Sequence, residues 1–142
     1  MYGSETWALT KRCEKKLIVF ENKILRKIYG PIQDELGWRI RKNRELRDLY
    51  QYPDIVARIK SRRLRWAGHV WRREDSSIIK TVDQYNPEGR RPLGRPRLRW
   101  KSQVLKDLTT VGTNPEAAED REEWRGIVGE AKNLLRFQWP RR

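Results

Sequence analysis

The chain has 142 residues, the length of one ordinary domain, and its 33 Lys and Arg against 19 Asp and Glu give a formal net charge of +14. Only 37% of the residues are hydrophobic and the mean hydropathy is −0.97, which argues against a deep apolar core and against a membrane span. The single cysteine, Cys13, excludes an internal disulfide, and with His69 as the single histidine it also excludes a Cys/His zinc site. We therefore expect an intracellular protein, nuclear or cytoplasmic, that lacks a secretory signal and uses no cofactor.

The first predicted element is an amphipathic helix over about residues 11 to 29. Thr10 caps its start through the hydroxyl group, and Gly30, followed by proline, ends it. Apolar residues recur along it at spacings of three and four, as they do in a helix with one buried face. These residues are Leu17, Phe20, Ile24, Leu25 and Ile28. Residues 31 to 42 are expected to form an irregular connection, and no segment alternates strongly enough to predict a sheet.

Two further helices are expected before residue 75. Asn43 caps a short one, and Pro53 lies in the first turn of a long one that continues to about residue 72. One face of the long helix packs on the first helix, and four basic side chains are expected to reach outward from it: Lys60, Arg62, Arg63 and Arg65. Gly68 costs this helix about 1 kcal/mol relative to alanine, which indicates close approach of another element or of a nucleic-acid strand.

The C-terminal half begins with a short helical contact near residue 78 and continues with the tract from 83 to 96, rich in Pro, Gly and Arg. Proline and glycine prevent regular structure there while arginine supplies charge, so a flexible phosphate-binding arm is the simplest interpretation. Pro96 begins a fourth main helix that ends at about residue 110.

The last predicted helix starts at Asn114, which is followed by a proline and an acid in the first turn, and it continues to about residue 136. Residues 113 to 131 carry six acids against two basic residues. This element is therefore expected to face away from nucleic acid or to fold against the basic helices. The predicted fold is all-α, with about five helices.

Most of the positive charge lies in the middle of the sequence. Residues 58 to 106 hold fifteen Lys and Arg against four acids, a net charge of +11 out of +14. Guanidinium groups form paired hydrogen bonds with phosphate oxygens, and neutralising phosphates releases counterions. Because few acids are near enough in sequence to neutralise these cations, RNA or DNA is the expected partner. A solvated helix face and a helix lying on an anionic membrane are the alternatives.

The sequence shows no arrangement of residues that predicts catalysis. His69 has neither a second ligand nor paired carboxylates nearby, and Cys13 has no histidine near it in sequence. The segment from Gly89 to Gly94 matches neither glycine-rich phosphate-binding motif. The acids are scattered or gathered in the last helix, and no pair suggests a Mg²⁺ site. We expect no enzymatic activity from this chain alone.

Five strings occur in order along nearly the whole chain: YGSETWALT (2–10), LRKIYG (25–30), RRLRWAGHVWR (62–72), GRRPLGRPRLRWKSQVLKDL (89–108) and AAEDREEWR (117–125). Together they resemble the C-terminal region of the endonuclease and reverse transcriptase polyprotein of non-LTR retrotransposons. In that family the region follows the polymerase palm. The family's aromatic-x-Asp-Asp turn and its apurinic-type endonuclease domain have no counterpart in this sequence, so the resemblance does not carry polymerase activity over to it.

The resemblance implies that the helices of residues 1–82 form a thumb-like unit that grips template and primer. Composition and helix signals add a basic flexible linker in 83–96 and a C-terminal helical pair in 97–142. The resemblance also implies that the following residues line the grip: Arg62, Arg63, Arg65, Trp66 and His69. Residues farther out that are expected to bind RNA or target DNA are Arg90, Arg91, Arg95, Arg97 and Arg99. Three tryptophans at helical spacing either stack on bases or pack in the core, which is the commoner outcome: Trp66, Trp71 and Trp100.

The predicted function is sequence-tolerant binding of RNA or DNA by a fragment or remnant of such a reverse transcriptase, with the rest of that enzyme as a further partner. Neither a membrane nor a small-molecule substrate is expected. One alternative is a structural or interaction module in which the acidic last helix docks on a basic partner or on its own basic helices. Another is a gene-model remnant without a selected function.

Overall fold

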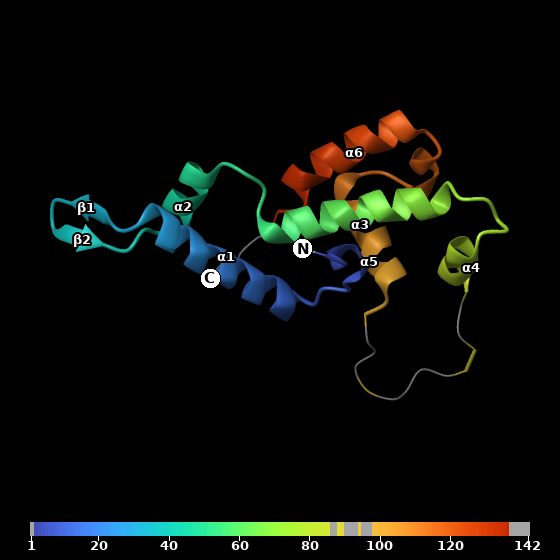
Figure 1. Cartoon of the computed structure of the whole chain (residues 1–142), viewed down its shortest axis with the longest axis horizontal. Helices are drawn as coiled ribbons and strands as arrows, with labels where there is room; N and C mark the ends of the chain where they lie inside the picture. Colours follow the sequence, from blue (N-terminus) through green and yellow to red (C-terminus); the bar gives the residue numbers. More distant parts are fainter. Residues whose placement is uncertain (1, 86–87, 90–93, 95–97, 137–142) are drawn as a thin grey trace.

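The computed structural model describes residues 2–85, 88–89, 94 and 98–136. The fold is mainly helical, so the all-α prediction is confirmed, with one two-stranded sheet added. The elements follow in the order η1 (Ser4–Thr6), α1 (Lys11–Tyr29), β1 (Ile32–Asp34), β2 (Gly37–Arg39), α2 (Asn43–Tyr50), α3 (Ile55–Trp71), α4 (Ile78–Gln84), α5 (Trp100–Val111), η2 (Pro115–Ala118) and α6 (Arg121–Leu134), where η marks a 3₁₀-helix. Helix α3 is central: α6 and α5 pack against it, α4 lies near one end, and α1, the hairpin and α2 extend from the other (Figure 1).

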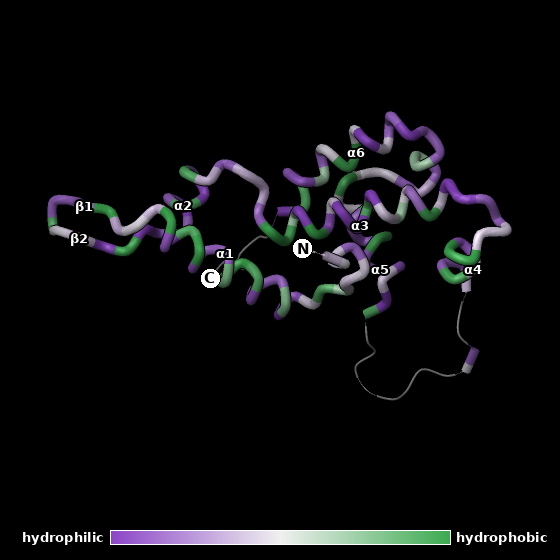
Figure 2. The backbone as a smooth tube through the Cα atoms, in the orientation of Figure 1, coloured by the Kyte–Doolittle hydropathy of each residue, from purple (hydrophilic) through white to green (hydrophobic). Residues whose placement is uncertain are grey.

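Helix α1 has the predicted bounds but buries a different face. The Thr10 hydroxyl accepts a hydrogen bond from the Cys13 N–H at 3.1 Å, and Gly30 ends the helix with a φ of 63°. Its buried residues are Glu14, Ile18, Asn22 and Leu25. Most of the apolar stripe expected to be buried is exposed instead, because Phe20, Ile24 and Ile28 are 57%, 41% and 68% exposed. Figure 2 shows apolar stretches on α1 and α4 as well as on the core helices.

The connection predicted to be irregular contains a β-hairpin. Strands β1 and β2 pair in antiparallel register, with Ile32 opposite Arg39 and Asp34 opposite Gly37. Gly37 has a φ of 111°, a conformation that only glycine adopts readily, and the Asp34 carboxylate accepts a hydrogen bond from the Leu36 N–H at 3.1 Å. Strands of three residues are too short for a period-two pattern to show in the sequence.

Helix α3 carries the core of the molecule. It begins after Asp54, whose carboxylate accepts a hydrogen bond from the Ala57 N–H at 2.9 Å, so the predicted start at Pro53 is two residues early. Leu64 and Ala67 of α3 meet apolar residues of α5 and α6 in one buried cluster. The buried members are Leu64, Ala67, Val104, Leu108, Ala118, Trp124, Val128, Ala131 and Leu135.

Helices α3 and α6 approach each other closely at Gly68. A Cβ atom built on it would lie 2.1 Å from Nε1 of Trp124, which is impossibly close. The Trp124 ring N–H also donates a hydrogen bond to the Leu64 carbonyl at 3.1 Å, and the Ser61 hydroxyl donates to the Val128 carbonyl at 2.9 Å. The glycine therefore serves helix packing, the first of the two alternatives that the sequence left open.

The C-terminal helices differ in detail from the prediction. Helix α5 begins at Trp100, three residues later than expected, and Asn114 starts only one 3₁₀ turn, η2. The helix that follows has its own cap, because the Asp120 carboxylate accepts hydrogen bonds from the Glu122 and Glu123 N–H groups at 2.8 and 3.0 Å. The predicted continuous helix from 114 is thus wrong, and α6 starts at Arg121.

The predicted division at residues 82 and 97 stays a prediction. Residues 86–87, 90–93 and 95–96 of the expected linker lie outside the described part of the chain. Helix α3 of the first predicted part shares its buried cluster with α5 and α6 of the third.

Candidate nucleic-acid interface

A basic cleft of about 700 Å³ lies between α3 and α6. Its cationic lining is Arg62, Arg65, Arg72, Arg121, Arg125 and Lys132. The first three come from α3 and its C-cap, and the others come from α6. Glu5, from η1, is the single acid among the described residues that line the cleft. Six cations against one carboxylate give this hollow a strongly positive potential.

The acid-rich segment contributes cations to this cleft because of helical periodicity. Arg121, Arg125 and Lys132 follow at spacings of four and seven, which places them on one face of α6. Glu123 and Glu130 fall on the opposite face by the same periodicity, and both are exposed. The sequence left two arrangements open for this element, facing away from nucleic acid or folding against the basic helices, and the second is the one found. The structure shows that α6 folds against α3 and presents its basic stripe to the cleft.

The cations of the cleft differ in how far protein groups already bind them. Arg125 pairs with Glu122 at 2.8 Å on the exposed surface, and Arg72 donates a hydrogen bond to the Ala118 carbonyl at 2.7 Å. Arg62 lies 3.8 Å from the Glu5 carboxylate. The other three form no hydrogen bond or ion pair within the described ranges: Arg65, Arg121 and Lys132. These three are the groups most available to an anionic ligand.

An aromatic pair lies beside these cations. Trp66 and His69, one turn apart on α3, stack with their ring centroids 5.3 Å apart and an interplanar angle of 28°. Trp66 is half-buried and His69 is exposed, and both line the cleft. A guanidinium N–H of Arg73 lies 3.3 Å from Nε2 of His69. The cleft thus offers a flat aromatic surface as well as positive charge.

A second hollow, of about 620 Å³, lies on the other side of Trp66 between α3, α4 and α5. Arg99, Trp100 and Lys101 line it together with mostly apolar residues of α3 and α4. The Trp100 ring N–H donates a hydrogen bond to the Glu5 carbonyl at 2.7 Å, which fixes η1 on α5. Apart from Arg63, the predicted site residues that the structure describes therefore divide between two hollows, and Trp66 lines both.

Arg63 does not belong to this surface, which corrects the prediction that it reaches outward to a ligand. Its side chain is fully buried, and two guanidinium N–H groups donate to one carboxylate oxygen of Asp107, Nε at 3.0 Å. A third donates to the Trp7 carbonyl at 2.9 Å. Burial raises the pKa of the Asp107 carboxyl, and the Arg63 guanidinium opposes that rise. The pair fixes α3 to α5, and Arg63 does not line the cleft.

Lys60 is likewise tied to the protein and does not reach outward as predicted. Its ammonium group lies 2.9 Å from the Glu14 carboxylate, and its side chain is 12% exposed. Burial acts to raise the pKa of Glu14, but hydrogen bonds from Lys60 and Lys11 outweigh it, so that the pKa is lowered overall. The lysine joins α3 to α1.

The remaining predicted residues have mixed outcomes. Arg62, Arg65, Trp66 and His69 lie together in the α3–α6 cleft, whereas Arg99 is exposed at the start of α5. Four predicted arginines lie outside the described residues: Arg90, Arg91, Arg95 and Arg97. Trp71 packs edge-on against Trp124 with ring centroids 5.8 Å apart, so for Trp71 core packing is the outcome.

Sequence reasoning missed Arg72 and the whole α6 wall of the cleft. The string at 117–125, used for the resemblance, already contained Arg121 and Arg125 at helical spacing. Within the described ranges, no three His, Cys, Asp or Glu side chains gather closely enough to hold a metal ion. No helix in those ranges is both long enough and apolar enough to cross a membrane.

A transposon-derived, uncharacterized protein of Caenorhabditis elegans is similar to most of this chain. The two are 28% identical over 135 residues, an alignment that covers 89% of this chain. The similarity supports a transposon origin. The alignment covers 48% of the relative, so the chain spans about half the length of the curated protein it matches. No protein-family model and no solved structure matches the chain.

Proposed function

We propose that this chain is a fragment or remnant of a non-LTR retrotransposon reverse transcriptase that binds RNA and DNA through the α3–α6 cleft. Phosphate groups are the ligands, so binding is tolerant of base sequence. The observation that carries the proposal is the convergence of six cations from two helices on one hollow with a single acid. Three of the six cations have no protein partner among the described residues and are available to phosphate: Arg65, Arg121 and Lys132.

Internal neutralisation by the acidic segment is the main competing explanation for the basic charge. It requires ion pairs between the cations of residues 58–106 and the acids of residues 113–131. Among the described residues, the ion pairs of those cations go to other acids: Glu5, Glu14, Asp75 and Asp107. The basic cleft therefore remains open to a phosphate backbone, which is consistent with the proposed binding.

The reverse transcriptase part of the proposal has separate support. The five strings of the sequence resemble the C-terminal region of that polyprotein, and the similar C. elegans protein is described as transposon-derived. The proposal assigns no catalysis to this chain. Its role in the longer protein would be to hold nucleic acid.

An interaction module is the second candidate, and one observation favours it. Phe20, Ile24 and Ile28 form an exposed apolar stripe on α1, a kind of surface that often contacts another protein. This stripe and the basic cleft are on different helices, so the two functions do not exclude each other. The third alternative, a gene-model remnant without a selected function, predicts that the protein is not detectable in cells.

Titration of labelled RNA, duplex DNA and RNA–DNA hybrid at several salt concentrations tests the proposal. The logarithm of the affinity should fall linearly with the logarithm of salt concentration, by about 0.7 to 0.9 per phosphate contacted. A double variant, Arg65→Ala with Arg121→Ala, should weaken all three ligands to a similar extent, because phosphate contacts carry no base information. Arg63 is left intact because its loss would disturb the fold. Binding that is indifferent to salt would rule the proposal out.

A further inference from the structure

Trp66 lies outside the buried cluster of α3, α5 and α6, and its ring N–H also sets it apart from three other tryptophans. The ring N–H groups of Trp71, Trp100 and Trp124 donate to Asp83, to the Glu5 carbonyl and to the Leu64 carbonyl. The ring N–H of Trp66 has no such partner in the part of the chain that the structure describes. Trp66 is half-buried, and its ring nitrogen is not among the buried atoms that lack a hydrogen bond, so this edge can be reached from the cleft.

We infer that the cleft takes a single strand of nucleic acid, with one unpaired base stacked on the Trp66–His69 pair; this rests on the proposed function. The two rings already form an offset stack, which a nucleic-acid base can extend. Every base has a π-face, so such stacking needs no particular sequence. In a duplex the faces of the bases are covered by their neighbours, so they are not free to stack on a protein ring.

The size of the cleft also favours a single strand. Its volume of about 700 Å³ is in the range of about 300 to 1,000 Å³ typical of pockets for small molecules. A hollow of this size admits an unpaired nucleotide, whereas a duplex would touch only its rim.

The charges indicate where the phosphates of that strand lie. Arg65 on one wall and Arg121 and Lys132 on the other have no protein partner in the described ranges. Glu5 lines the same cleft near Arg62, and one of its carboxylate oxygens is buried without a hydrogen bond. A carboxylate repels phosphate, so the backbone is expected to follow the three free cations and to avoid the Glu5 side. The strand then passes Trp66 with cations on both sides.

Three ligands with equal numbers of phosphates test this inference: a single-stranded oligonucleotide, an abasic strand of the same length and a blunt duplex. The wild-type protein should bind the base-bearing strand more tightly than the abasic strand. Trp66→Leu should weaken binding of the base-bearing strand about tenfold and leave the abasic strand and the duplex unchanged, because only stacking is lost. Trp66→Phe, which keeps an aromatic ring, should restore most of the affinity.

The outcomes separate this inference from the proposed function. Equal wild-type affinity for the base-bearing and abasic strands would overturn the single-strand inference and leave phosphate binding intact. Failure of all three ligands to bind at low salt would overturn both. His69→Ala is a second variant at an exposed position, so that it tests the stack even if Trp66→Leu does not fold. It should also weaken the base-bearing strand selectively, and an equal effect on all three ligands would contradict stacking.

Discussion

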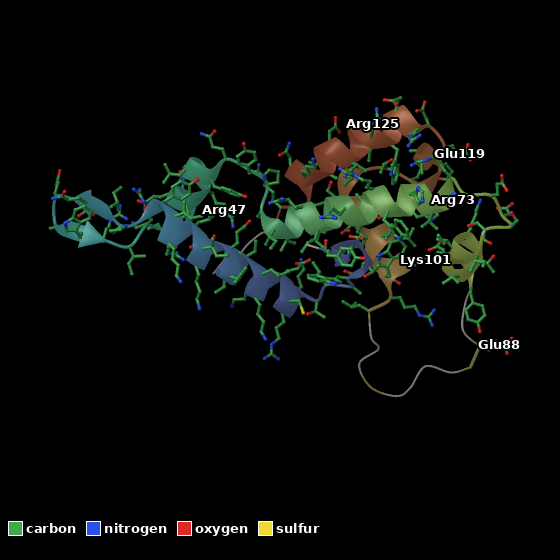
Figure 3. The ribbon with its side chains drawn as sticks, in the orientation of Figure 1. Arg47, Arg73, Glu88, Lys101, Glu119 and Arg125 are labelled. Atoms are coloured by element: carbon green, nitrogen blue, oxygen red, sulfur yellow. The ribbon has the colours of Figure 1, made fainter. Side chains whose placement is uncertain are left out.

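The arginines around the hairpin and those of the α3–α6 cleft have different surroundings. Arg39 joins the hairpin to α2, with Nε 2.6 Å from Asp34 and a second nitrogen 2.7 Å from Glu45. Arg47 of α2 lies 2.7 Å from Glu21 of α1, and Figure 3 shows it between these helices. In the cleft, by contrast, Arg65 and Arg121 contact no carboxylate within the described ranges.

Two more arginines of the N-terminal region are bound by the protein itself. Arg26 donates to the Arg41 carbonyl at 3.3 Å and to the Asn43 side chain at 2.6 Å. Arg41 in turn donates to the Gly30 carbonyl at 3.2 Å. These bonds hold the ends of α1 and α2 together. Arginine thus joins elements in one region and lines an open cleft in another, according to which acceptors the fold brings near it.

The first prediction concerns Arg63, which behaves like an internal arginine although it is next to the cleft residues in sequence. Arg63→Met should lower the free energy of unfolding by about 3–5 kcal/mol, because it leaves the Asp107 carboxylate buried and unpaired. Urea denaturation measures this. Arg65→Met, at an exposed position, should change the stability by less than about 0.5 kcal/mol.

A double variant sharpens this result. Replacing both partners, Arg63→Met with Asp107→Leu, should recover most of the lost stability, because no buried charge then remains. Similar small effects of Arg63→Met and Arg65→Met would contradict the distinction between a structural and an available arginine.

The second prediction tests the packing that forms the cleft walls. Gly68→Ala should destabilise the protein by about 1–3 kcal/mol, because the new methyl group would force the Trp124 indole away from α3. Gly126→Ala is the matched control, since a Cβ atom there meets nothing within 4 Å and alanine favours a helix by about 1 kcal/mol. Thermal or urea unfolding of both variants measures the difference. A stabilised Gly68→Ala protein would show that α3 and α6 are not packed this closely.

The third and smallest effect concerns pH and the hairpin region. The Arg39 hydrogen bond, with help from the Lys42 N–H, lowers the pKa of Glu45 from 4.5 to about 2. A carboxyl whose pKa is lowered on folding stabilises the folded state above the unfolded pKa, and this contribution is lost as the pH falls from about 4.5 to about 2. Urea denaturation across this range should therefore show a larger loss of stability in the wild-type protein than in Glu45→Gln. If the free energy of unfolding falls equally with pH in both proteins, the Arg39–Glu45 ion pair does not stabilise the folded state in solution.

Local signals predicted much of the helical fold. The Thr10 cap and Gly30 gave the bounds of α1, because both act on adjacent backbone groups. The hairpin was missed because its strands are three residues long. The Asn114 side chain does accept a hydrogen bond from the Ala117 N–H, as a helix cap does, but the turn it starts is only the 3₁₀-helix η2, and a local signal does not show how long a helix continues.

The sequence predicted most of the cleft residues that α3 contributes, but it did not predict that α6 forms the opposite wall of the cleft. Arg63 follows Ile59 and precedes Ala67 by four residues, so its place on the buried face was visible in the helical period. Its partner Asp107 is 44 residues away in sequence, and nothing local indicates that pairing. Likewise, the net negative charge of residues 113–131 concealed the basic stripe that α6 contributes. Charge totals cannot show which face of a helix meets which neighbour.

The central claim is that the position of cations in the cleft, rather than their number, determines nucleic-acid binding. Two triple variants test it with equal loss of charge: Arg65→Ala, Arg121→Ala and Lys132→Ala in the cleft, against Lys16→Ala, Lys23→Ala and Lys27→Ala on the exposed surface of α1. The measurement is the affinity of each for one single-stranded RNA at one low salt concentration. We expect the cleft variant to lose affinity at least about tenfold and the α1 variant by about twofold or less, because only the cleft cations contact phosphates directly. Equal losses in the two variants would contradict the claim.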